Sequence, residues 1–99
     1  MRYSVTIRSD AQRDIASVAL WYERQQPGIG NCFLVCVDAA LEAVKRSPLG
    51  YRKSHGEFRR ILVRKFPVGI FYLIHREQVV VAAVIDLRRN PAAIEERLR

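Results

Sequence analysis

The sequence has few of the residues on which several protein classes depend. Its 99 residues include only two cysteines, Cys32 and Cys36, which excludes a disulfide framework. These cysteines lie four residues apart in a helix-like stretch, and we expect reduced thiols in the core, because free cysteine is readily buried. A metal site would need two more ligands, and the only histidines are His55 and His75. We therefore predict no metal site.

Long hydrophobic runs are also absent. The longest run extends from Val79 to Ile85, whereas a helix that spans a bilayer needs about 20 apolar residues. The first six residues, MRYSVT, lack the apolar core of a secretory signal. The sequence therefore predicts a cytoplasmic protein without a membrane span.

Motifs of the common catalytic sites are missing as well. The sequence has no GxxxxGK[ST] phosphate loop, no HExxH, no GxSxG and no cluster of cysteine and histidine. Gly28-Ile29-Gly30 is better explained as a turn than as part of a phosphate-binding loop. The acidic residues of the second half fall in loops, a turn and the terminal segment, whereas a two-metal nuclease needs carboxylates that converge on one site. We predict no catalytic residues and no cofactor.

Positive charge, in contrast, is abundant. Seventeen Lys and Arg against ten Asp and Glu give a net charge of +7. Residues 1–50 hold six basic and five acidic residues, and residues 51–99 hold eleven and five. This asymmetry indicates a basic surface in the second half, directed at nucleic acid, an acidic protein or a membrane surface. Exposed aromatic residues at the spacing of base stacking are missing, so an acidic protein is an equally natural partner.

The hydrophobic pattern predicts one α+β domain that begins with a strand and a helix. A chain of 99 residues, 49% of them hydrophobic, has room for a single domain. Residues 3–8 alternate apolar with polar, which is typical of a half-buried strand. Ser9 with Gln12 predicts a capping box at the start of a helix, and that helix should end at Pro27-Gly28.

A second helix should follow from Asn31, and a short connection makes the two helices an antiparallel hairpin. Each helix has an apolar stripe at helical spacing that should face a common core. The stripes consist of Ile15, Val18, Ala19 and Tyr22 in the first helix, and of Phe33, Val37, Leu41 and Val44 in the second.

The rest of the chain changes to a period of two. We predict a loop over residues 51–57, three antiparallel strands over residues 58–65, 69–75 and 78–86, and a tight turn at Arg76-Glu77. Asn90 as N-cap and Pro91 at the first helical position predict a short final helix.

Basic residues recur along these strands, in Arg52-Lys53, Arg59-Arg60, Arg64-Lys65 and Arg88-Arg89. Arg60 and Arg64 flank Leu62 on one face of the predicted strand, where their guanidinium groups can clamp a phosphate or simply be solvated. Tyr72 is expected in the core, and His75 at an exposed strand end.

Two stretches carry a resemblance to a known family. Residues 58–72, FRRILVRKFPVGIFY, precede a valine-rich strand and residues 83–91, AVIDLRRNP. They resemble the arginine strand, the FP-x-x-I-x-Y strand and the V-x-H-x-R-R-x-P ending of the ParE/RelE superfamily of small bacterial toxins. The resemblance implies an N-terminal strand, an antiparallel helical hairpin packed on a twisted antiparallel β-meander, and a short C-terminal helix.

The resemblance also implies one of two targets. RelE-like members are implied to cleave mRNA on the ribosome, and ParE-like members to poison DNA gyrase without nuclease residues. Here Gly69 stands where RelE-like chains have a strand arginine, Leu62 stands where they have a lysine, and residues 90–99 contain neither tyrosine nor histidine. These differences favour the ParE-like branch, although Asp86 stands where ParE-like chains often have histidine.

The ParE-like resemblance implies a non-enzymatic toxin that a cognate antitoxin neutralises in a hetero-oligomer and that contacts DNA only through that antitoxin. A role in plasmid stabilisation would follow. We expect five residues to contact the target: Arg60, Arg64, Arg88, Arg89 and Arg97. Two alternatives remain open, namely a ribosome-dependent endoribonuclease and a degenerate, non-toxic member that serves only as a partner or co-repressor of the antitoxin.

Overall fold

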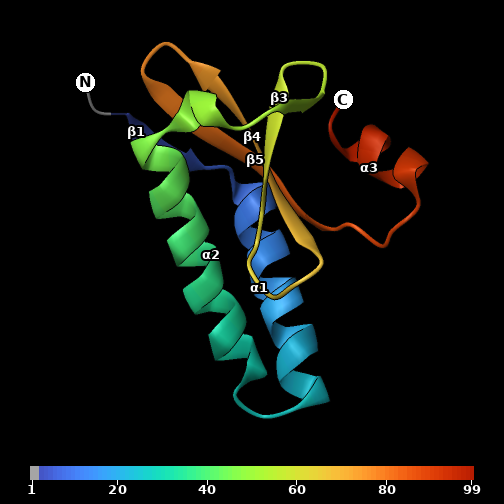
Figure 1. Ribbon diagram of the computed structural model, residues 1–99. Helices are drawn as coiled ribbons and strands as arrows, with labels where there is room; N and C mark the ends of the chain where they lie inside the picture. Colours follow the sequence, from blue (N-terminus) through green and yellow to red (C-terminus); the bar gives the residue numbers. More distant parts are fainter. Residues whose placement is uncertain (1–2) are drawn as a thin grey trace.

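A computed structural model describes residues 3–99, which form a five-stranded sheet with helices on both faces (Figure 1). Met1 and Arg2, the start of the segment interpreted as lacking a secretory signal, lie outside the described residues. The elements in chain order are β1 (Ser4–Ile7), α1 (Ser9–Gln25), α2 (Ile29–Arg46), the 3-10 helix η1 (Pro48–Gly50), β2 (Lys53–His55), β3 (Phe58–Leu62), β4 (Val68–His75), β5 (Gln78–Asp86) and α3 (Pro91–Arg97).

The strands are arranged in the order β1-β5-β4-β3-β2. The β2–β3, β3–β4 and β4–β5 pairs are antiparallel, while β1 pairs in parallel with β5. The predicted α+β class, helical hairpin, β-meander and final helix are therefore confirmed. The parallel β1–β5 pair makes the sheet mixed, a feature that the periodicity of the N-terminal strand did not reveal.

The residues of β4 alternate between two apolar cores, because successive side chains of a strand point to opposite faces. Ile70 and Tyr72 pack under the α1–α2 hairpin, in a core that also contains Phe33, Val37 and Val44. Phe71 faces the other way and packs with Ile94 of α3 and with Leu98, the residue that directly follows α3. This coverage on both faces explains why β4 is apolar at nearly every position.

A bulge in β5 keeps the same division on the neighbouring strand. Phe71 pairs with Ala83 and Tyr72 pairs with Val81, so Ala82 is an extra residue between them. Val81 and Val84, an odd and an even position, consequently both face the helical hairpin. Ala83 and Ile85 face α3.

The helical hairpin is closed by Glu23 near the end of α1. Its carboxylate accepts hydrogen bonds from the backbone N–H of Gly28 and of Gly30, at 3.0 Å each for the shorter contacts. It thereby satisfies free donors at the start of α2 and places negative charge at the positive end of that helix. Gly28 has φ of +95°, a conformation that glycine adopts without steric cost.

The predicted start of the first helix is wrong in detail. The N-cap is Arg8 rather than Ser9, and no side chain caps it. The N–H of Arg8 still bonds to the C=O of Val81, so the chain remains in the sheet until it turns into the helix at Ser9. Gln12 donates instead to the C=O of Ile7, at 3.1 Å.

Two strand predictions also need correction. Residues 51–57, predicted as a loop, contain β2, which forms a two-residue hairpin with β3 at Gly56 and Glu57. The strand predicted over residues 58–65 ends at Leu62. Lys65 has φ of +73°, a conformation that a strand cannot contain.

The two cysteines are free, as expected, but they are not both in the core. Cys36 is half-buried and packs against the hairpin core, whereas Cys32 is exposed. Their four-residue spacing fits one helical face, but Cys32 lies at the edge of that face.

No helix within residues 3–99 has the length and apolar character required to cross a bilayer.

Candidate target-binding surface

Arg60 lies on the face of the sheet opposite the helical hairpin. It is an exposed residue of β3, and its side chain extends over Gly69 of β4, where a Cβ atom would lie 3.2 Å from Arg60 Cδ. The same Cβ position lies 3.1 Å from Leu87, which follows β5. The side chain of Arg60 therefore extends across β4 toward Leu87. It covers Gly69, the position at which RelE-like chains are expected to have an arginine.

Arg64, Arg88 and Arg89 are exposed at the adjoining end of the sheet. The N–H of Leu87 donates to the C=O of Pro67 at 2.8 Å, which joins the segment after β5 to the β3–β4 turn. Because Arg64 is three residues before Pro67, and Arg88 and Arg89 directly follow Leu87, these arginines belong to one basic region.

The β3–β4 turn is fixed by an aromatic cluster. The ring of Phe66 lies 4.8 Å from that of Tyr22 and 5.3 Å from that of Phe33. Burial raises the pKa of Tyr22, while the nearby charge of Arg88 lowers it. This cluster holds Arg64 on a turn rather than on the predicted strand, so the premise that Arg60 and Arg64 flank Leu62 on one strand face is corrected.

Arg88 is held by the aspartate that replaces the expected histidine. Its Nε and Nη2 atoms donate to the two carboxylate oxygens of Asp86, at 3.0 Å and 2.7 Å. The hydrogen bond from Arg88 holds the pKa of Asp86 below its usual range. Asp86 therefore fixes the guanidinium of Arg88 and neutralises part of the charge of the basic region.

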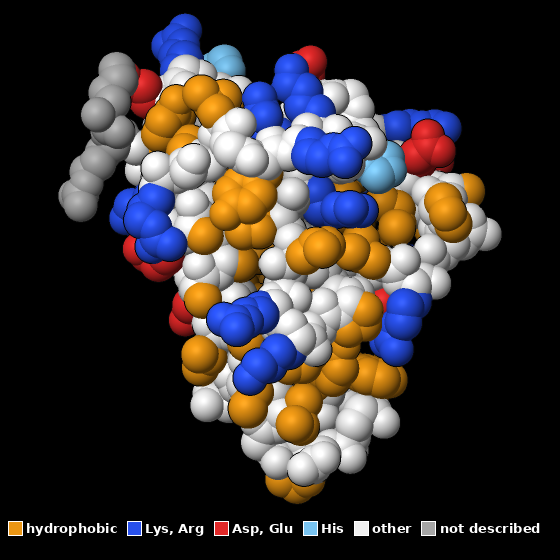
Figure 2. Space-filling view, viewed as in Figure 1, with side chains coloured by type: hydrophobic (Ala, Val, Ile, Leu, Met, Phe, Trp, Pro, Cys, Tyr) orange, Lys and Arg blue, Asp and Glu red, His pale blue; other side chains and the backbone are white. Residues whose placement is uncertain are grey.

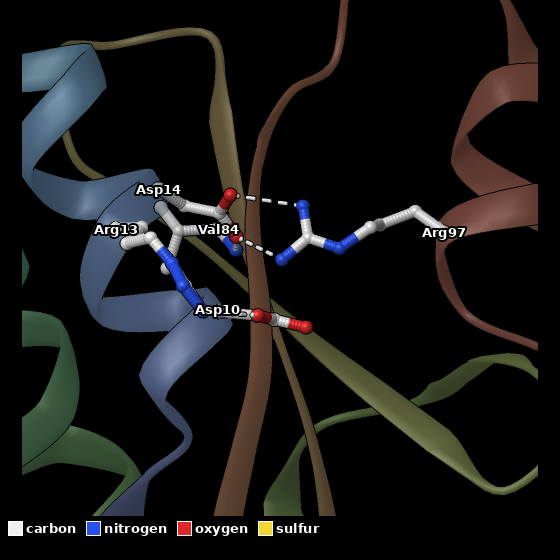
Figure 3. Close-up of polar contacts among 5 residues, drawn as sticks. All are labelled: Asp10, Arg13, Asp14, Val84 and Arg97. Atoms are coloured by element: carbon white, nitrogen blue, oxygen red, sulfur yellow. Dashed lines mark hydrogen bonds and ion pairs between the residues drawn. The ribbon is translucent and has the colours of Figure 1, made fainter.

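Arg97 is engaged within the protein, where its side chain points toward Asp14 (Figure 3). Its guanidinium forms two hydrogen bonds with the carboxylate of Asp14, at 2.8 Å and 2.7 Å. Asp14 also accepts from the N–H of Val84, at 3.0 Å. The pair, with side chains 29% and 17% exposed, joins α1, β5 and α3, so Arg97 has a structural role that the sequence did not indicate.

A groove of about 780 Å³ lies between residues 50–54 and residues 60–62. It is lined by the basic residues Arg52, Lys53 and Arg60. Figure 2 shows that Lys and Arg side chains gather on the upper part of the visible face, with hydrophobic side chains between them. Arg52 and Lys53 are not among the five residues that the sequence analysis expects to contact a target, because residues 51–57 were interpreted as a loop. The signal for a β2–β3 hairpin was the glycine of His55-Gly56-Glu57-Phe58.

Two side chains hold the outer wall of this groove in place. The buried hydroxyl of Tyr72 donates to the C=O of Pro48 at 2.7 Å, and Arg59 donates to the C=O of Tyr51 at 2.6 Å. Tyr72 is in the core, as predicted, and His75 is at the exposed end of β4, also as predicted. In the part of the chain that the structure describes, no three His, Cys, Asp or Glu residues gather as metal ligands.

Comparisons with known proteins identify the fold. No protein-family model matches the sequence, and no curated protein matches it. Among solved structures, the chain is similar to a chain of the chromosomal ParDE toxin–antitoxin system from P. aeruginosa, with a TM-score of 0.77 and 9% identity over 86% of this chain and 96% of that one. It is also similar to a chain of the toxin–antitoxin complex RelBE2 from Mycobacterium tuberculosis, with a TM-score of 0.58 and 20% identity over 87% of this chain and 99% of that one. The chain therefore has the ParE/RelE fold, which confirms, at the level of the fold, the superfamily resemblance found in the sequence.

Proposed function

We propose that this chain is the toxin of a type II toxin–antitoxin pair, of the ParE-like branch. It acts in the cytoplasm, inhibits DNA gyrase by protein contact, and is neutralised by a cognate antitoxin in a hetero-oligomer. The proposal is carried by the basic region at one end of the sheet, in a fold shared with chains of ParDE and RelBE2.

The basic region is suited to an acidic protein surface. Arg60, Arg64 and Arg89 are exposed, and no carboxylate within residues 3–99 forms a salt bridge with any of them. Long-range attraction between opposite charges accelerates the encounter of two proteins. Charge reversal in this region should therefore weaken target binding, whereas Arg97, paired with Asp14, should contribute through the stability of the fold.

The proposal can be tested by inducing the chain in bacterial cells and measuring the supercoiling of a reporter plasmid and the integrity of mRNA. We expect growth arrest with loss of negative supercoiling. The Arg60→Glu and Arg89→Glu variants should relieve both the growth arrest and the loss of supercoiling. The control variant Arg24→Glu, which reverses one exposed charge in the last turn of α1, should relieve neither. Arrest with mRNA cut within codons and normal supercoiling would contradict the proposal.

A second candidate function is ribosome-dependent mRNA cleavage. The observation in its favour is the groove in which Arg52, Lys53 and Arg60 gather, since cations stabilise the charge that develops on a phosphate during cleavage. The same induction experiment separates the two candidates. A chain that binds its antitoxin without arresting growth would instead be the non-toxic partner considered above.

A further inference from the structure

The single tryptophan of the chain is left on the surface of α1. Trp21 is 49% exposed and lies outside both apolar cores. Tryptophan, tyrosine and arginine are the residues most enriched among the anchors of protein interfaces. The position of Trp21 relative to the basic region therefore decides whether it can contact the same target.

Trp21 lies beside the arginines that follow β5, because α1 and β5 run alongside each other in the same direction (Figure 1). Asp14 of α1 accepts a hydrogen bond from the N–H of Val84 in β5. Trp21 follows Asp14 by two helical turns on the same face. Two helical turns and three strand residues both advance about 10 Å, so Trp21 lies level with Leu87, directly before Arg88-Arg89.

The surroundings of the next residue agree with this placement. The charge of Arg88 acts on the hydroxyl of Tyr22, and the ring of Phe66, in the β3–β4 turn, packs against the ring of Tyr22. Trp21 therefore adjoins both basic segments, the one after β5 and the one in the turn. We call the exposed residues gathered here the aromatic–basic patch: Trp21, Arg64, Arg88 and Arg89.

The indole is held by a row of rings that leads into the core. Trp21 packs edge-on against Tyr22, with ring centroids 5.1 Å apart. Tyr22 contacts Phe66, and Phe66 contacts Phe33, which is fully buried. A side chain that is already held in one orientation loses little conformational entropy when a partner binds. Trp21 is therefore suited to act as a binding anchor.

We propose that Trp21 is the apolar anchor of the target-binding surface. The partner is a protein surface with an apolar pocket for the indole and with carboxylates at the rim of that pocket. Arg64 and Arg89 form no salt bridge within residues 3–99, so their charges are free to pair with such a rim. A central aromatic anchor that is surrounded by polar contacts provides most of the affinity in many protein interfaces.

A single-stranded nucleic acid fits this patch less well. Proteins that bind single strands present several exposed rings on which successive bases stack. Here the ring of Trp21 is exposed, whereas Tyr22 and Phe66 are half-buried against the core. The carboxylate of Asp86, which holds Arg88, would also repel a phosphate. The patch therefore favours a protein partner.

The proposal rests on the proposed function for the identity of the target, so its test uses purified DNA gyrase. The dissociation constant is measured by biolayer interferometry. We expect Trp21→Ala to weaken binding about thirtyfold, as the loss of an interface anchor does, and Trp21→Phe, which retains a ring, about fivefold. Leu20→Ala removes an equally exposed side chain, 50% against 49%, from the adjacent position and should weaken binding less than about twofold.

The charges of the patch are tested in the same assay. Arg89→Glu should weaken binding about tenfold, because it places a carboxylate against the acidic rim of the pocket. Arg24→Glu makes the same change in net charge. Arg24 lies two residues after Tyr22 and therefore on the opposite side of α1, so this control should change the dissociation constant less than about twofold.

A fluorescence measurement tests whether the indole itself is covered. Because the chain has one tryptophan, its replacement by 5-hydroxytryptophan gives a single fluorophore, which is excited at a longer wavelength than the tryptophans of gyrase. Acrylamide should quench this fluorophore in the free chain and much less in the gyrase complex. Thermal unfolding of each variant verifies that it is folded.

Equal weakening by Trp21→Ala and Leu20→Ala would overturn the anchor and leave the gyrase proposal standing, as would unchanged acrylamide quenching in the complex. Gyrase binding that depends on Trp21 without inhibition of supercoiling would support the anchor and overturn the gyrase inhibition. Absence of binding between the parent chain and gyrase would overturn both proposals. Tighter binding of a 12-nucleotide single strand of DNA, abolished by Trp21→Ala, would overturn the protein partner.

Discussion

Tyr72 shows how a single hydroxyl connects the core to the segment that precedes β2. It is fully buried in β4 and bonds to the C=O of Pro48, and burial raises its pKa to about 12. The pKa of tyrosine in an unfolded chain is about 10. The folded state therefore binds the phenolic proton more tightly, and this stabilisation, complete below pH 10, is lost as the pH rises through 10 toward 12.

We predict that Tyr72→Phe lowers the free energy of unfolding by about 1 kcal/mol at pH 8, the contribution of one hydrogen bond. The variant should also lose less stability than the parent between pH 10 and 12. Urea unfolding at a series of pH values measures both effects. Tyr51→Phe, a change at a half-buried tyrosine of the same region, is the control, and equal pH profiles for Tyr72→Phe and the parent would disprove the assignment.

Asp14 carries two kinds of contact, and two substitutions separate them. Asp14→Ala removes the ion pair with Arg97 and leaves the N–H of Val84 without its acceptor. We predict a loss of about 2–3 kcal/mol in unfolding free energy. Asp14→Asn retains an acceptor oxygen and should cost less, whereas Asp10→Ala, which breaks the exposed pair with Arg13, should cost less than about 0.5 kcal/mol. Similar losses at Asp14 and Asp10 would contradict the structural role of Arg97.

At the scale of elements, the helical hairpin depends on one close approach. A Cβ atom at Gly30 would lie 2.6 Å from the C=O of Ala19 in α1, and a backbone atom cannot move aside as a flexible side chain can. Alanine normally stabilises a helix interior by about 0.5–1 kcal/mol relative to glycine.

We predict the opposite sign here: Gly30→Ala should destabilise the protein by about 1–3 kcal/mol, because the helices must separate. Chemical denaturation measures this change. Asn31→Ala, at the next and exposed position of α2, serves as the control and should be nearly neutral. A stabilised Gly30→Ala variant would show that the helices do not approach this closely.

Local patterns predicted the elements well, but they did not predict contacts between distant residues. The stripes of α1 and α2, the N-cap of α3 at Asn90 and the Arg76-Glu77 turn depend on neighbours in sequence, and the structure confirms them. The Asp14–Arg97 pair joins residues 83 positions apart, so no pattern of neighbouring residues could predict it. The sequence analysis missed β2 because its three residues are polar or basic. A strand at the edge of a sheet does not need apolar side chains, so it leaves no hydrophobic pattern in the sequence.

At the scale of the whole molecule, the two faces of the sheet differ in what covers them. One face is buried under the helical hairpin, and the other is only partly covered by α3. The remaining surface carries Arg60 and the basic groove, and the adjoining end of the sheet carries Arg64, Arg88 and Arg89. The excess charge of the second half of the sequence is thus presented by strands and turns that the core holds rigid.

The central claim is that this basic surface acts by contacting another protein without breaking a covalent bond. Its most direct measurement is ATP-dependent supercoiling by purified DNA gyrase with increasing amounts of the purified chain. We predict dose-dependent inhibition that requires Arg60 and is unaffected by Arg24→Glu. Undisturbed gyrase, together with cleavage of ribosome-bound mRNA that depends on Arg60, would contradict it.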